Sequence, residues 1–231
     1  MVKNKKFNMN TWERLNIPVN DWDNLLRIKY NENTKPGGIF CDVGACNGVI
    51  TKFFKNIAGD GGKVYAFELN KYNYDSIKYL SSYNCIIENL AISDKSEIVT
   101  IYGDNYNAGN HISNIIGHDT AFRKMNVIGN INSITLDDYF KDKPLDYLKI
   151  DVEGAELKVI KGGIETIRKC KYVIIECHFQ TDWKDIYELL SSNNLEFKNL
   201  VDDVLIYYGD TVVVPGIASN GMPYQIYLKN N

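Results

Sequence analysis

A regular alternation of short apolar runs with amphipathic stretches constrains the fold of this chain most strongly. Strands are predicted at 38–44, 63–70, 85–93, 97–103, 145–154 and 170–179, and helices at 47–59, 72–84, 154–169 and 181–194. Such alternation is typical of β-α-β units, so we predict an α/β fold with a mostly parallel sheet. Extended pieces at 195–201, 204–209 and 225–231, with little helix between them, predict antiparallel strands at one edge.

The length of 231 residues suits one sizeable core better than two. Residues 1–35 carry apolar residues at helical intervals, so we predict an N-terminal helical extension before a single domain at 36–231. Within that domain, 103–133 is polar and weakly periodic, which is typical of a substrate loop or lid, although a disordered or packing loop fits equally well. The residues of this segment that could contact an acceptor are Tyr106, Asn107, His111 and Asn114.

The composition disfavours several classes of function. The net charge is −3 without a basic block, so we expect no nucleic-acid partner. No apolar run approaches the roughly 20 residues that cross a bilayer, so we expect no membrane span. The five cysteines form no CxxC pair, which favours free thiols in a reducing compartment, here the cytoplasm, over zinc. The sequence leaves a homo-oligomer open.

Three predicted strands end in residues that suit a ligand site. These ends are DVGACNG at 42–48, Glu68-Leu69-Asn70, and the acidic stretch at 151–154. In a parallel sheet, ligands bind beyond the carboxyl ends of the strands. Glycines in the first turn allow close approach of the backbone to a ligand, and Glu68 could accept hydrogen bonds from both hydroxyls of a ribose. The pattern predicts a nucleoside site, and the alternative is a plain strand–turn–helix with a surface acid.

Five segments occur in a fixed order across about 36–178, namely DVGACNG, VYAFELN, ENLAISD, TLDDY and YLKIDVEGAELKVIKGG. Together they resemble the FkbM-type methyltransferases. The resemblance implies a class I methyltransferase (Rossmann-like) fold, with a seven-stranded, mostly parallel sheet, helices on both faces and an antiparallel C-terminal edge. It also implies S-adenosylmethionine as the cofactor. The chain departs from the family pattern at Cys46, where Asn is usual, and at Leu69, where Pro is usual.

The resemblance also implies roles for the residues at the strand ends. Asp42 and the turn at 44–48 would hold the methionine part of the cofactor, and Glu68 would hold the ribose. Asp151 would lie where the sulfonium end of the cofactor meets the acceptor. The cofactor-binding residues predicted in this way are Asp42, Gly44, Ala45, Asn47, Gly48, Glu68, Leu69, Asn89, Leu90 and Asp151.

The chemistry of the cofactor agrees with these roles, because its sulfonium and ammonium groups favour nearby carboxylates. A sugar hydroxyl is a poor nucleophile, so a positioned base is expected, and the candidates are Asp151, Glu153 and His178. Glu153 could instead be a carboxylate at a helix N-terminus, and His178 could make a structural hydrogen bond. These three with Glu176 could bind a divalent ion, but their spacing does not demand one, so no metal site is predicted.

The sequence as a whole predicts an S-adenosylmethionine-dependent O-methyltransferase that acts on a hydroxyl of a small molecule, and a sugar or glycan is the preferred acceptor. One alternative is an NAD(P)- or nucleotide-sugar-dependent oxidoreductase. That class prefers a GxGxxG turn to bind pyrophosphate, whereas residues 44–48 read GACNG. A second alternative is a non-catalytic module that binds the cofactor and keeps the fold.

Overall fold

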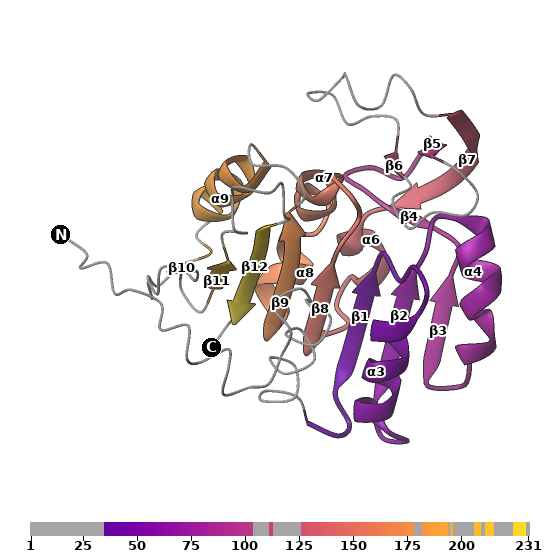
Figure 1. Cartoon of the computed structure of the whole chain (residues 1–231). Helices are drawn as coiled ribbons and strands as arrows, with labels where there is room; N and C mark the ends of the chain where they lie inside the picture. Colours follow the sequence, from indigo (N-terminus) through magenta and orange to yellow (C-terminus); the bar gives the residue numbers. More distant parts are fainter. Residues whose placement is uncertain are drawn as a thin grey trace, which may run out of the picture.

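The computed structural model describes residues 35–103, 111–112, 126–177, 182–193, 195, 206–208, 211–214 and 224–229. Within these residues, the main sheet has eight strands (Figure 1). They are β1 (Ile39–Val43), β2 (Lys63–Phe67), β3 (Cys85–Glu88), β8 (Tyr147–Ile150), β9 (Tyr172–Cys177), β10 (Ile206–Tyr208), β11 (Thr211–Val214) and β12 (Tyr224–Lys229).

The strands of the main sheet lie in the order β10-β11-β12-β9-β8-β1-β2-β3. The five from β9 to β3 are parallel, and β12, β11 and β10 continue the sheet as antiparallel strands. This confirms the predicted mostly parallel sheet with an antiparallel C-terminal edge. The described part contains eight strands rather than the implied seven, and β11 was not predicted as a strand.

The chain reverses its direction of travel across the sheet between β1 and β8. It runs outward from β1 through β2 to β3 and then returns to β8 on the other side of β1. Asp42 is in register with Lys149, and Val43 with Ile150, so β1 and β8 end at the same level. A crevice forms at such a reversal, beyond the carboxyl ends of the strands, and it is the usual ligand site of an open α/β sheet.

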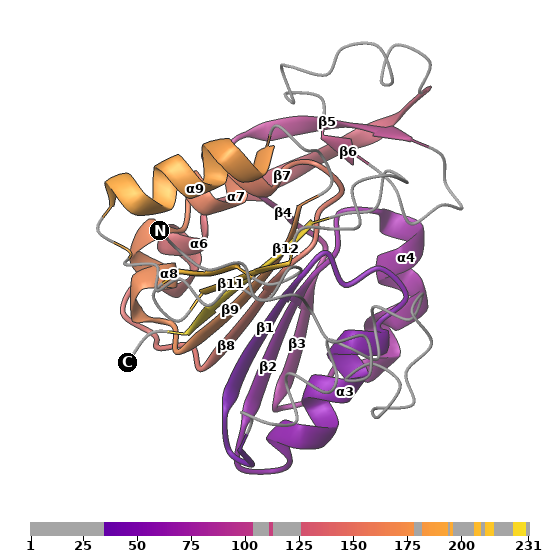
Figure 2. The same ribbon diagram turned by 60° about the vertical axis from the view of Figure 1, so that its left-hand side comes forward.

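Helices cover both faces of the sheet (Figure 2). Phe40 points to one face and packs on Phe54, with ring centroids 5.0 Å apart, whereas Cys41 and Val43 belong to the core on the other face. The first face carries α3 (Val49–Ala58), α4 (Lys71–Ile77) and the 3-10 helix η1 (Lys78–Leu80). The second carries α6 (Leu136–Phe140), α7 (Glu156–Lys161), α8 (Ile164–Lys169) and α9 (Asp182–Ser192).

A smaller sheet lies beyond the carboxyl ends of the parallel strands (Figure 1). Its order is β4-β7-β5-β6, with β4 (Ala91–Ile92), β5 (Ile98–Gly103), β6 (His111–Ile112) and β7 (Asn126–Ile134). The single strand predicted at 85–93 is therefore wrong, because it divides into β3 of the main sheet and β4 of this one. The segment at 103–133 is also more regular than expected, since its last part belongs to β7.

The helix predicted at 154–169 is two helices, α7 and α8. They meet at Gly162 and Gly163, where the chain passes close to the end of β4. A Cβ on Gly162 would lie 2.2 Å from the carbonyl oxygen of Ser93, so only glycine fits. The break follows from this contact between distant segments, which helical periodicity does not reveal.

Several predicted features lie outside the described residues. They are the helical extension up to residue 34, the acceptor candidates Tyr106, Asn107 and Asn114, and the base candidate His178. His111 lies in β6, but its side chain is not described, and the same holds for Glu176 in β9. In the part of the chain that the structure describes, no helix is long and apolar enough to cross a bilayer.

Candidate active site

A pocket opens at the carboxyl ends of β1, β2 and β8, beside the point where the strand order reverses. All three strand ends that the sequence singled out contribute to it. Its wall combines apolar side chains with several carboxylates. The lining residues are Val43, Gly44, Ala45, Cys46, Asn47, Val49, Ile50, Phe67, Glu68, Leu69, Leu90, Ala91, Ile92, Lys149, Asp151, Val152 and Glu153.

The turn after β1 requires glycine at position 44. Gly44 has a φ of +84°, and a Cβ there would lie 1.8 Å from the carbonyl oxygen of Asp151. The N–H groups of Gly44 and Ala45 donate to the carbonyl oxygen of Phe67, at 2.9 and 3.0 Å. The turn is thus wedged between the end of β2 and the loop after β8, and its backbone forms part of the pocket wall.

Glu68 lies at the end of β2 with its side chain almost fully buried. Its Oε2 accepts a hydrogen bond from the Cys46 N–H at 2.7 Å, and its Oε1 accepts one from the Asn70 N–H at 2.8 Å. Burial raises the pKa of the Glu68 carboxyl, and these hydrogen bonds oppose the rise. Each oxygen keeps further acceptor capacity. Glu68 therefore ties the turn after β1 to β2 while lining the pocket.

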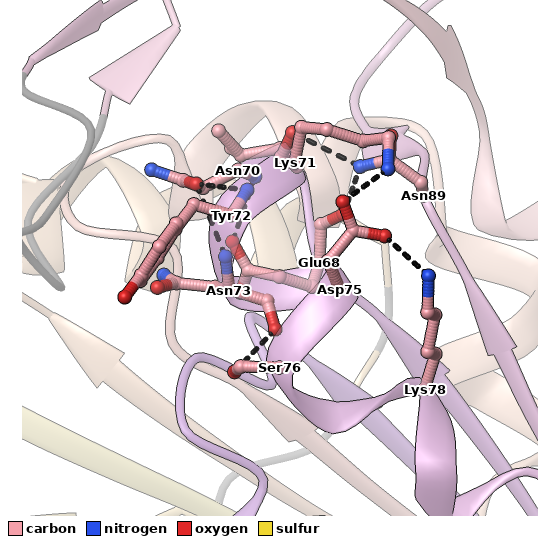
Figure 3. A network of polar contacts seen from close by, with 10 residues as sticks. Glu68, Asn70, Lys71, Tyr72, Asn73, Asp75, Ser76, Lys78 and Asn89 are labelled. Carbon is pink, nitrogen blue, oxygen red and sulfur yellow. Dashed lines mark hydrogen bonds and ion pairs between the residues drawn. The ribbon is translucent and has the colours of Figure 1, made fainter.

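The Asn70 N–H, which donates to Glu68, lies at the start of α4, and side chains around this point hold the backbone in place (Figure 3). The Asn70 Oδ1 caps α4 by accepting from the N–H groups of Tyr72 and Asn73, at 2.8 and 3.2 Å. The Asn89 Nδ2 donates to the backbone carbonyl oxygens of Glu68 and Leu69, at 2.8 and 3.2 Å. Asn89 thus braces the backbone at the end of β2 from behind the pocket wall, to which its neighbour Leu90 contributes directly.

Lys149 is a site residue that the sequence analysis missed. Its Nζ lies 3.1 Å from Asp151 Oδ2 and 3.3 Å from Asp42 Oδ1, and it donates to the Gly44 carbonyl oxygen at 2.9 Å. One ammonium group therefore joins the turn after β1 to the loop after β8. The signal was present in the sequence, because a lysine inside the apolar run YLKI must pair with acids if the strand is buried.

Asp42 lies beneath the pocket rather than in its wall. It is fully buried, its Oδ2 accepts from the Thr51 hydroxyl at 2.6 Å, and its Oδ1 faces Lys149 in an ion pair. Burial raises the pKa of the Asp42 carboxyl, and the Lys149 charge is the largest influence that lowers it. Asp42 therefore supports Lys149 and α3. A direct contact with a cofactor, which the resemblance implies, stays a prediction.

The loop after β8 places two acids in the pocket wall, Asp151 and Glu153. It is shaped by the buried Glu156, whose Oε1 accepts from the N–H groups of Val152 and Gly154 at 3.2 and 3.1 Å. Glu156 also begins α7, so it takes the N-terminal position that was an alternative for Glu153. Glu153 has a φ of +56°, in the left-handed region that disfavours a side chain.

Glycine at position 153 is expected to stabilise the protein while slowing its reaction. Glu153→Gly removes the left-handed strain, worth about 1 kcal/mol, and should raise the melting temperature by about 2–4 °C. The control is Lys141→Gly, since Lys141 is exposed, has a φ of +49° and lies outside the pocket. Differential scanning calorimetry should show both gains, and only Glu153→Gly should lower turnover. Equal turnover in both variants would exclude a role for the Glu153 carboxylate.

The structure brings together most of the predicted site. Gly44, Ala45, Asn47, Glu68, Leu69, Leu90, Asp151 and Glu153 all line the pocket. Asp42, Gly48 and Asn89 are not in its wall; Gly48, with a φ of +74°, is the N-cap residue of α3. In the described residues, no three His, Cys, Asp or Glu side chains gather as they would around a metal ion. The pocket can bind a polar ligand that extends from the end of β2 past the end of β1. The carboxylates of Asp151 and Glu153 would then face the part of the ligand nearest β8.

Sequence comparisons place this arrangement among methyltransferases. The model of a family described as the methyltransferase FkbM domain matches residues 42–198. The hexuronic acid methyltransferase AglP of Haloferax volcanii is 44% identical over 48 residues, which are 21% of this chain and 20% of that protein. The chain thus matches only a small part of the length of this relative.

Two solved structures share the fold. Methyltransferase FkbM from Methylobacillus flagellatus KT is 15% identical with a TM-score of 0.52, and the match covers 87% of this chain and 50% of that one. A putative rRNA methylase from Clostridium thermocellum is 12% identical with a TM-score of 0.54, covering 92% and 97%. At such identities the likeness shows the fold alone, and it confirms the predicted class I methyltransferase fold.

Proposed function

This chain belongs to the FkbM methyltransferase family, and from that premise we propose that it is an S-adenosylmethionine-dependent O-methyltransferase acting on a hydroxyl of a sugar or glycan. The observation that carries the proposal is the buried Glu68 carboxylate in the wall of one pocket with the glycine turn after β1. A carboxylate at the end of the second strand suits two ribose hydroxyls. The turn contains no GxGxxG pattern for a pyrophosphate, which S-adenosylmethionine lacks.

The residues of the pocket fit the parts of this cofactor. Glu68 would accept hydrogen bonds from the ribose, and Leu69 and Leu90 would contact the adenine. The backbone of Gly44 and Ala45 lines the pocket between Glu68 and Asp151, where the methionine part would lie. When bound, the cofactor supplies an activated methyl group on a sulfonium. Because the charge already exists on the sulfur, the protein needs to align the two reactants and exclude water rather than stabilise new charge.

Asp151 and Glu153 are the described residues that could take a proton from the acceptor. Both line the end of the pocket near β8, and the Asp151 side chain is 26% exposed, so an acceptor can reach it. Lys149 holds Asp151 Oδ2 in place at 3.1 Å. The acceptor hydroxyl would donate its proton to one of these carboxylates as its oxygen attacks the methyl group. The third candidate, His178, keeps its proposed role as an alternative base.

The acceptor class rests on a short alignment. The relative that matches 48 residues of this chain is a hexuronic acid methyltransferase, so a uronic acid or another sugar is the proposed acceptor. The matched length is small, so a neutral sugar belongs in the same test. Incubation with S-adenosylmethionine labelled in its methyl group should transfer label to p-nitrophenyl glucuronide or to p-nitrophenyl glucoside.

Ligand binding separates this proposal from its two alternatives. S-adenosylhomocysteine, the demethylated product, should raise the melting temperature in a thermal-shift assay, and NAD should not. Stabilisation by NAD alone would instead indicate the oxidoreductase. Binding of S-adenosylhomocysteine with no label transferred to any sugar would indicate the non-catalytic module.

Removal of the Glu68 carboxylate should mainly weaken cofactor binding. Glu68→Ala is expected to lower the affinity for S-adenosylhomocysteine by about 10- to 100-fold, because charge-assisted hydrogen bonds to the ribose are lost. Isothermal titration calorimetry measures this change. Asp75→Asn is the matched control, since Asp75 is an exposed acid of the adjacent α4 that pairs with Lys71 and Lys78 outside the pocket. Equal weakening in both variants would argue against a ribose contact at Glu68.

A further inference from the structure

Lys149 places a positive charge in a pocket that is proposed to bind a cation. Its side chain is 5% exposed, and it is the only buried lysine or arginine among the residues whose side chains the structure describes. Its Nζ contacts carboxylate oxygens of Asp42 and Asp151, at 3.3 and 3.1 Å. Burial of a charge is costly unless it is paired, so these contacts explain how Lys149 is tolerated. They also mean that the three residues together carry one negative charge instead of two.

The charge beside the pocket matters because the donor and the product of the proposed reaction differ by one charge. S-adenosylmethionine has a sulfonium, and S-adenosylhomocysteine has a neutral thioether in its place. If Glu68 at the end of β2 holds the ribose, the rest of the ligand extends along the pocket toward β1 and β8. Lys149 lies in β8 and lines that part of the pocket. Its charge therefore acts on the sulfonium and hardly on the thioether.

We propose that Lys149 sets the preference of the pocket between the methyl donor and its demethylated product, by offsetting the negative charge of Asp42 and Asp151. This inference rests on the proposed function. During transfer the positive charge leaves the sulfur, so a pocket with excess negative charge would stabilise the bound donor more than the transition state. Lys149 limits this excess of negative charge. It therefore also reduces the extent to which the pocket binds S-adenosylmethionine more tightly than S-adenosylhomocysteine.

The test compares two variants that differ only in this cation. Loss of Lys149 alone would leave Asp42 as an unpaired buried carboxyl that could take up a proton and hide the change in charge. The reference is therefore Asp42→Asn, and the test variant is Asp42→Asn/Lys149→Met, which buries no unpaired carboxylate at position 42. Isothermal titration calorimetry gives the dissociation constants of S-adenosylmethionine and S-adenosylhomocysteine for each. General damage to the pocket weakens both ligands alike, so the ratio of the two constants isolates the effect of the charge.

In the double variant, the dissociation constant of S-adenosylhomocysteine divided by that of S-adenosylmethionine should be about tenfold higher than in Asp42→Asn. Lys55→Met is the control, since Lys55 donates to the Leu80 carbonyl oxygen and lies outside the pocket; its ratio should equal that of the wild type. If the double variant does not fold, Asp42→Asn/Lys149→Gln replaces it, because its amide can still donate to Gly44. A shift below about twofold in the folded variant would overturn the inference. If neither ligand binds the wild-type protein, the proposed function itself has failed.

Discussion

Gly44→Ala is expected to abolish detectable binding of S-adenosylhomocysteine and to lower the melting temperature by about 10 °C. The added Cβ would lie 1.8 Å from the carbonyl oxygen of Asp151, and the φ of +84° disfavours any side chain. The clash can be relieved only if the turn after β1 moves away from the loop after β8. We expect a loss of stability of about 3–5 kcal/mol, which for a domain of this size corresponds to the stated shift.

Gly59→Ala separates the effect of the clash from the effect of the backbone conformation. Gly59 also has a positive φ, +58°, but an added Cβ would meet nothing within 4 Å. This variant should lose about 1–3 kcal/mol, because a φ of +58° with a ψ of −164° suits glycine alone, and it should keep its affinity for S-adenosylhomocysteine. Calorimetric titration and thermal melting of both variants give the comparison. Normal ligand binding by Gly44→Ala would mean that the turn after β1 does not form the cofactor site.

Asp151→Asn is expected to lower the turnover of methyl transfer by about 10³-fold while the affinity for S-adenosylhomocysteine changes only a few-fold. Asparagine keeps the shape of the side chain and removes its ability to accept a proton, and general-base catalysis is worth about 10²–10⁴ in rate. Asp151→Ala, which also removes the contact with Lys149, should abolish transfer. The single-turnover rate with labelled S-adenosylmethionine and p-nitrophenyl glucuronide measures the effect directly.

An acid far from the pocket controls for the Asp151 experiment. Asp142 is fully exposed and lies 3.6 Å from Lys169 on the surface, so Asp142→Asn should transfer methyl groups at the wild-type rate. A wild-type rate in Asp151→Asn as well would remove Asp151 as the base. The same assay on Glu153→Gln would then decide whether the neighbouring carboxylate has that role.

The parts of the site that the sequence predicted are those that a short stretch of residues reveals by itself. A turn rich in glycine, an acid at the end of the next strand and an acidic stretch after a later strand can each be read within a few residues. The parallel sheet then brings them together, because neighbouring strands end at one edge. Gly44, Glu68 and Asp151 therefore met in one pocket as expected.

The features that the sequence analysis missed depend on contacts between distant segments. The run at 85–93 divides because Ala91 and Ile92 pair with Ser133 and Ile134 of β7, some forty residues away. The helices α7 and α8 separate because Gly162 packs against the Ser93 backbone. The hydrophobic periodicity within each segment does not reveal either contact.

Lys149 is an intermediate case between these two groups. A lysine in a buried strand signals that carboxylates lie nearby, and Asp151 is close to it in the sequence. The pairing with Asp42 depends on the register of β1 with β8, which the sequence does not specify. The contact of Asp42 with the ligand, which the resemblance implies, stays a prediction, and in the structure Asp42 is buried and pairs with Lys149. The position of Asp42 at the end of a strand was thus predictable from the sequence, and its ion pair with Lys149 was not.

A crystal structure of the protein soaked with S-adenosylhomocysteine tests the central claim most directly. We expect density for the ligand in the pocket at the ends of β1, β2 and β8, with both ribose hydroxyls about 2.5–3.0 Å from the Glu68 carboxylate oxygens. The sulfur should lie toward Lys149 and Asp151. A ligand bound at another place on the protein, or bound in this pocket with its ribose away from Glu68, would contradict the account.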